Sequence, residues 1–149
     1  MLFRKNMGKL NTALMLVLAT WAFTFWGYVW YATIFDDLWQ SLIGQTEGEL
    51  ILLAEKRGLS QSILTYAISF VQALGLYILQ TASASKTFID FQIRAFVVSL
   101  FIASPVLGNE VLFTGSSEKL WIFDSLHFIF GYAGISVIFW IWRKYFIST

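Results

Sequence analysis

Apolar residues are grouped along the chain into four runs that polar connections separate. The runs at residues 10–35 and 59–85 contain no charged residue, and those at about 87–107 and 120–142 each contain two ionisable ones. A helix needs roughly 20 residues to span the ~30 Å hydrocarbon layer of a bilayer. The pattern therefore predicts an all-α fold, an integral membrane four-helix transmembrane bundle that forms one domain over residues 1–149.

The connection between the first two runs has its own helical pattern. Leu38, Trp39, Leu42 and Ile43 share one face of a helix, and Thr46 and Glu49 have the spacing of a capping box. We expect a short amphipathic segment in this first outer loop. The alternative is a simple extension of the second transmembrane helix beyond the membrane.

Charge placement predicts the orientation of the bundle. Basic residues dominate the N-terminal tail, the connection between the second and third runs, and the C-terminal tail, whereas acidic residues dominate the other two connections. The positive-inside rule places the basic side in the cytoplasm. We therefore expect both termini to be cytoplasmic.

Composition excludes several classes of protein. The chain is 58% hydrophobic and 13% charged, well below the roughly 25% charge of soluble domains. A net charge of +1 gives no field that would attract nucleic acid. With no cysteine and a single histidine, the sequence predicts neither a metal site nor a cofactor.

Asp124 and His127 are the main candidates for a functional site. They lie three residues apart, on one helix face within the fourth run. Tyr31, Asp36 and Asp37 lie toward the same membrane side, so a polar cluster could form between the first and fourth helices. Ionisable groups inside a membrane mark ion or proton sites by default. The alternative is a structural pair that joins helices or contacts water at the boundary.

A second group of charged residues is expected near the inner boundary. Asp90 and Arg94 have the favoured i, i+4 order of acid before base, and Arg94 can extend toward lipid headgroups. The side chains that we expect to anchor the bundle to lipids are Lys86, Asp90, Arg94, Arg143 and Lys144. The only proline, Pro105, is expected to kink or end the third helix just before Gly108.

Two stretches resemble a family of bacterial membrane proteins known as domain of unknown function 1761. The first contains Trp30-Tyr31 followed by Phe35 and Trp39. The second comprises Asn109, Leu112-Phe113, Glu118-Lys119-Leu120, Asp124, His127 and Gly131. The resemblance implies a four-helix topology and a bacterial cytoplasmic (inner) membrane, and it brings no known activity.

Three classes of function remain. The first is a non-enzymatic membrane protein that self-associates or serves as an accessory subunit, because the sequence contains no catalytic motif. The second is a small oligomeric transporter or channel for protons, ions or solutes that uses Asp124 and His127. The third is a membrane enzyme acting on a lipid or quinone. The expected partners are membrane lipids and either further copies of the chain or another membrane protein.

Overall fold

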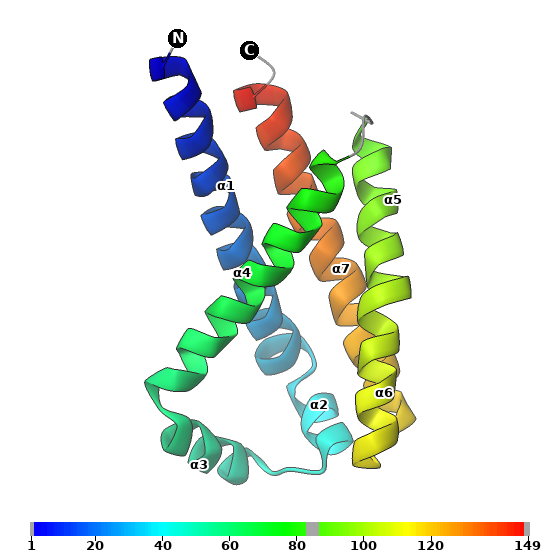
Figure 1. Cartoon of the computed structure of the whole chain (residues 1–149). Coiled ribbons are helices and arrows are strands. Elements are labelled where there is room, and N and C mark those ends of the chain that lie inside the picture. Colours follow the sequence, from blue (N-terminus) through cyan, green and yellow to red (C-terminus); the bar gives the residue numbers. More distant parts are fainter. Residues whose placement is uncertain (1, 83–86, 148–149) are drawn as a thin grey trace.

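The computed structural model describes residues 2–82 and 87–147, and in this part of the chain all regular secondary structure is helical, joined by short turns (Figure 1). The first long helix is α1 (Leu2–Val29), which continues into a π-helical turn, η1 (Trp30–Ile34). It is followed by α2 (Asp36–Ile43), α3 (Glu47–Arg57) and the long α4 (Leu59–Thr81). The rest comprises α5 (Phe88–Val98), the π-helical turn η2 (Ser99–Ala103), α6 (Ser104–Thr114), α7 (Glu118–Trp142) and the π-helical turn η3 (Arg143–Ile147).

Four segments of the described chain are long and apolar enough to cross a membrane. They are Leu10–Ile34, Leu59–Thr81, Phe88–Thr114 and Glu118–Phe146. The predictions of an all-α fold and of four such helices are therefore confirmed. Residues 83–85 of the second predicted run, and the candidate anchor Lys86, lie outside the described residues.

The prediction that the third helix ends at Pro105, just before Gly108, is wrong. The third segment continues through Pro105 and Gly108 and ends at Thr114, where Gly115 adopts a left-handed φ of 70°. Pro105 occupies the first turn of α6, directly after the π-helical turn η2. In such a turn the hydrogen bonds run from i to i+5, so the helix can continue across a residue that has no N–H.

The first connection contains two short helices, α2 and α3. Gly44, with a left-handed φ of 68°, ends α2. The predicted capping box is confirmed at the start of α3: Glu49 N–H donates to Thr46 Oγ1, and Thr46 N–H donates to the Glu49 carboxylate. The hydrogen bonds that the Thr46 N–H and the Thr46 hydroxyl donate to the exposed Glu49 carboxylate hold its pKa below its usual range.

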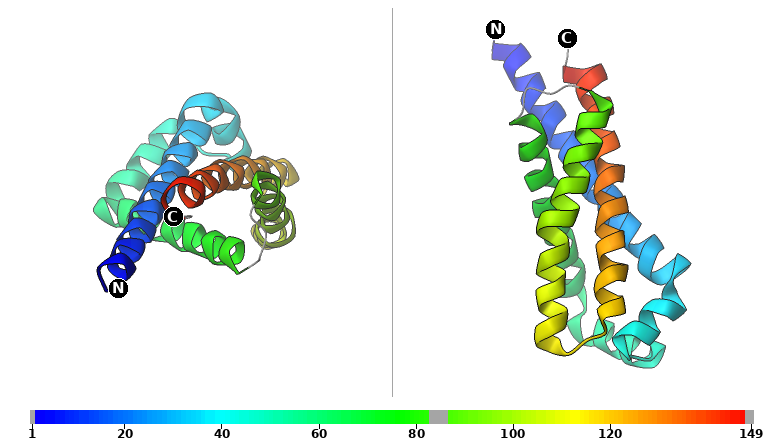
Figure 2. Two further views of the ribbon diagram at one scale, coloured as in Figure 1. Left: turned by 90° about the horizontal axis from the view of Figure 1, so that it is seen from above. Right: turned by 90° about the vertical axis from the view of Figure 1, so that its right-hand side faces the viewer.

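The start of α1 and the end of η3 lie at one end of the bundle, together with the end of α4 and the start of α5 (Figures 1 and 2). We call this the terminal end. The opposite end, which we call the loop end, contains α2, α3 and the turn between α6 and α7 (Figure 1). Helix α7 packs against α1, α5 and α6, whereas α4 packs mainly against α1 and diverges from α5 and α7 toward Leu59 (Figures 1 and 2).

Apolar side chains from α1, α4, α5 and α7 form the core. Its buried members are Met15, Leu16, Ala19, Phe23, Ala73, Leu76, Phe91, Ala95, Tyr132, Ile135 and Phe139. Polar side chains within the spans bond across helices: Gln80 Nε2 donates to Ser136 Oγ, and Ser125 Oγ donates to Ser104 Oγ at 2.9 Å. Such bonds satisfy polar groups that lipid cannot.

Candidate functional site

The centre of the candidate site is a hydrogen bond between the first and fourth spans. Tyr31 Oη, on the π-helical turn η1, donates to Asp124 Oδ1 on α7 at 2.9 Å. The Tyr31 ring also faces His127, with 4.8 Å between the ring centroids. Of the predicted group, the structure therefore brings Tyr31, Asp124 and His127 together.

The other two predicted neighbours lie on α2. The carboxylate of Asp36 accepts a hydrogen bond from Gln40 Nε2 at 2.9 Å, within its own helix. The side chain of Asp37 is exposed. Within the described part of the chain, neither Asp36 nor Asp37 forms a hydrogen bond with Asp124 or His127. A third acidic group, Glu110 of α6, is near enough for its charge to act on Asp124.

The His127 imidazole is enclosed by aromatic rings. His127 is only 5% exposed. The rings of Phe23, Trp26, Trp30, Tyr31 and Phe128 have centroids 4.8–6.4 Å from its own. Trp26 lies parallel to the imidazole and donates its indole N–H to the main-chain oxygen of His127 at 3.1 Å. We call these six residues the imidazole cluster.

Both nitrogens of the His127 imidazole are buried and have no hydrogen-bond partner within the described chain. The backbone at Gly27 approaches one of them, since a Cβ placed there would lie 3.7 Å from Nε2. A buried polar group without a partner costs about 1–3 kcal/mol, and His127 is one of seven described residues that contain such an atom. The described residues contain no cluster of three or more metal-ligating side chains.

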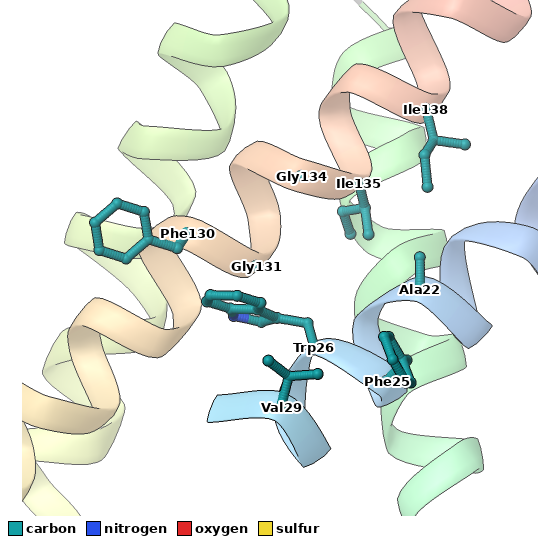
Figure 3. A pocket seen from close by; sticks show the side chains of 9 residues that line it. All are labelled: Ala22, Phe25, Trp26, Val29, Phe130, Gly131, Gly134, Ile135 and Ile138. Carbon is teal, nitrogen blue, oxygen red and sulfur yellow. The ribbon is translucent and has the colours of Figure 1, made fainter. Parts of the chain in front are cut away.

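A groove of about 480 Å³ between α1 and α7 adjoins the imidazole cluster (Figure 3). Trp26 extends from α1 toward Gly131 of α7, so its ring belongs to both the cluster and the groove (Figure 3). The remaining lining residues are Ala22, Phe25, Val29, Phe130, Gly134, Ile135 and Ile138. Apart from the Trp26 indole nitrogen, no lining side chain carries a polar atom.

The candidate anchors near the terminal end have specific contacts in the protein. The Asp90 carboxylate accepts from Thr87 N–H, and Asp90 N–H donates to Thr87 Oγ1, and these two bonds form a capping box at the start of α5. Arg94 is half-buried and donates to the main-chain oxygen of Gln80 at 3.0 Å. The Arg143 guanidinium lies 5.9 Å from the Phe91 ring centroid, and Lys144 Nζ lies 5.0 Å from that of Trp140.

The sequence pointed to the three polar side chains of the site but not to the rings around them. Phe23, Trp26 and Trp30 lie three and four residues apart on α1 and η1, which is the spacing of one helix face. That spacing was visible in the sequence. It did not reveal that this face meets His127, because the pairing of helices depends on the packing of the whole bundle.

The described chain is thus a bundle of four apolar helices, compatible with a membrane protein, whose first and fourth spans meet at a polar and aromatic cluster. A model of the family described as protein of unknown function (DUF1761) matches residues 14–140. The chain belongs to this family, and the resemblance seen in the sequence is confirmed. No curated protein matches the chain, and no solved structure does.

The glycines of α7 provide a first prediction. A Cβ at Gly131 would lie 2.5 Å from Phe23 Cε2 and 2.9 Å from Trp26 Cδ1, whereas a Cβ at Gly134 would meet nothing within 4 Å. We expect Gly131→Ala to destabilise the protein by roughly 1–3 kcal/mol, since two cluster rings must move. Thermal unfolding in detergent measures the loss.

Gly134→Ala is the matched control. The same change of one methyl group on the same helix should be neutral or stabilise by up to about 1 kcal/mol, because alanine favours helices. Equal unfolding temperatures for the two variants would contradict the packing described for Gly131.

Proposed function

We propose that this protein is a non-enzymatic integral membrane protein that self-associates through α4. The observation that carries the proposal is an abrupt change of burial along this helix. Ser69, Ala73, Leu76 and Gln80 are buried against the other helices. In contrast, every residue from Leu59 to Ile68 is exposed.

The exposed half of α4 continues the face that is buried in the other half. Ser62 and Thr65 lie seven and four residues before Ser69, so the three side chains share one helix face. This face is buried against the same protomer from Ser69 onward, whereas before Ser69 it is exposed and borders a groove beside α1 and α3. A face suited to helix packing therefore extends beyond the protomer's own bundle.

The exposed part of this face borders a groove of about 580 Å³ between α1, α3 and α4. The groove is lined by Thr24, Ala54, Glu55, Gly58, Gln61, Ser62, Thr65 and Tyr66. The Thr24 hydroxyl in it is buried and has no hydrogen-bond partner among the described residues. Small and hydroxyl-bearing residues of this kind are typical of contacts between transmembrane helices.

A second copy of the chain suits this surface because hydroxyl and carboxamide groups are self-complementary. Each such group carries both donors and acceptors, so Ser62, Thr65 and Gln61 of one copy can pair with the same residues of another. Packing of this face on itself forms an isologous, twofold contact, the commonest kind in homo-oligomers. The accessory-subunit form of the hypothesis differs in placing a helix of another protein here.

Cross-linking tests the proposed interface. Because the chain contains no cysteine, Ser62→Cys introduces a single thiol on the proposed contact face. Oxidation in membranes should join most Ser62→Cys chains into disulfide-linked dimers. Leu64→Cys is the control, because it lies two positions further along the same exposed part of α4 and points to a different face.

The outcomes separate the hypotheses. Dimers with Ser62→Cys but not with Leu64→Cys, together with a homo-oligomer in native mass spectrometry, agree with self-association. Cross-linking of Ser62→Cys to a different protein would instead support the accessory-subunit hypothesis. A monomer in native mass spectrometry that forms no cross-link at either position would refute both self-association and contact with another protein through this face.

The orientation that we propose has the terminal end in the cytoplasm, and the bacterial cytoplasmic (inner) membrane is the location that the family resemblance suggests. Assigning the charged residues to the two ends places seven basic residues and one acidic residue at the terminal end, with Lys86 assigned by its position in the sequence. Three basic and eight acidic residues belong to the loop end, Asp124 included. The positive-inside rule supports this orientation.

Labelling of single cysteines in intact cells tests this orientation. Gly48→Cys, on α3 at the loop end, should react with a maleimide that cannot cross the membrane. Lys5→Cys, in the N-terminal tail, should react only after the cells are opened. The reverse pattern would show that the protein has the opposite orientation.

Proton or ion conduction is a second candidate function, favoured by the imidazole cluster. Asp124 and His127 are ionisable groups within a span, and both imidazole nitrogens are unpaired within the described chain. The Tyr31 hydroxyl is bonded to Asp124 and the Tyr31 ring lies beside His127, so the three side chains form one group between the first and fourth spans.

Proton flux into liposomes tests this second candidate. We expect Asp124→Asn and His127→Ala each to reduce the flux by about tenfold, which corresponds to roughly 1.4 kcal/mol on the transport barrier. Asp37→Asn is the control, because it removes an exposed carboxylate outside the cluster. Unchanged flux in both Asp124→Asn and His127→Ala, with folding verified by thermal melts, would exclude this mechanism.

A further inference from the structure

A second pocket lies toward the terminal end of the bundle, where α1, α4, α5 and α7 come together. Its volume is about 200 Å³, and it is lined by Met15, Tyr77, Thr81, Phe91, Phe139 and Arg143. Arg143 is the only charged residue among them. The pocket thus combines an apolar wall with a single guanidinium group.

The Arg143 guanidinium is not fully paired within the described protein. Its Nη1 is buried from solvent and has no hydrogen-bond partner there. The Arg143 Cζ atom lies over the Phe91 ring, 5.9 Å from its centroid. At least one strong donor therefore remains available in the pocket.

The surrounding charges favour an anion. Arg94, Arg143 and Lys144 are the basic side chains described at this end, and Asp90 is the one described acidic side chain there. The hydrogen-bonding contacts of the Asp90 carboxylate with Thr87 lie at the start of α5. Arg94 donates to the Gln80 main chain, and Lys144 lies over Trp140, so Arg143 alone lines the pocket.

We infer that this pocket binds a phosphate group of an anionic ligand through the Arg143 guanidinium. Phosphate oxygens match the planar array of guanidinium donors, and such charge-assisted hydrogen bonds are the strong ones. Arg143 follows directly after Trp142, the last residue of α7, so it lies at the membrane boundary where lipid phosphates are found. The walls formed by Met15, Phe91 and Phe139 suit the apolar part of a lipid. This site does not depend on self-association.

Native mass spectrometry of the full chain tests the site. The protein is released from nanodiscs made with phosphatidylglycerol, and in a separate experiment with phosphatidylcholine. We expect phosphatidylglycerol to remain bound to the wild type and to be retained about tenfold less by Arg143→Gln. Lys144→Gln is the matched control, because it removes the same charge from the neighbouring residue, which does not line the pocket.

A second measurement distinguishes a lipid from a soluble anion. Inorganic phosphate is added to the protein in phosphatidylcholine nanodiscs, and the unfolding temperature is recorded. A rise that is absent in Arg143→Gln identifies a soluble phosphate as the ligand source, whereas selective retention of phosphatidylglycerol identifies the lipid. Arg143→Lys retains the positive charge, so it is a control for a variant that loses binding only because it misfolds. It should bind more weakly than the wild type in either experiment.

Two results would overturn the inference. The first is equal loss of phosphatidylglycerol in Arg143→Gln and Lys144→Gln, which would mean that general surface charge holds the lipid. The second is that correctly folded wild-type protein neither retains phosphatidylglycerol nor shows a higher unfolding temperature with inorganic phosphate.

Discussion

The structure depends on one constraint, which is that polar groups inside a bilayer must find their partners within the protein. Long helices satisfy the backbone, and side-chain bonds between helices, such as Gln80 with Ser136 and Ser104 with Ser125, satisfy the few polar side chains in the spans. The same constraint draws attention to the exceptions. Thr24, His127 and Arg143 each have a buried polar atom without a partner in the described chain, and each lies at a different surface or cluster of the bundle.

Three of the seven described residues that have such an atom lie in distinct regions of the molecule. The Thr24 hydroxyl borders the groove beside the exposed half of α4, where we propose that a second copy docks. His127 lies between α1 and α7, enclosed by aromatic rings. Arg143 lies in a pocket at the terminal end. Self-association, proton handling and anion binding would therefore use separate surfaces, and one protein could combine them without competition between the sites.

The close contact between α1 and α7 links the core to the candidate site. Gly131 allows Phe23 and Trp26 to approach α7 more closely than any other residue would. Phe23 belongs to the buried core and also contacts His127, while Trp26 contacts His127 and lines the groove between the two helices. The geometry around the imidazole is therefore set by the packing of the same rings that hold the two helices together.

The sequence by itself determined the four spans, the capping box at Thr46 and the family, because these depend on local runs of apolar residues, fixed spacings and short motifs. It also identified Tyr31, Asp124 and His127 as candidates, since ionisable and aromatic groups near a membrane boundary are conspicuous. Only the tertiary structure decided that Tyr31 bonds to Asp124 and that the third helix passes through Pro105. It also revealed the unpaired half of α4. These features depend on which helix faces meet and on how the backbone adjusts at π-helical turns, and both are decided by packing between segments far apart in the chain.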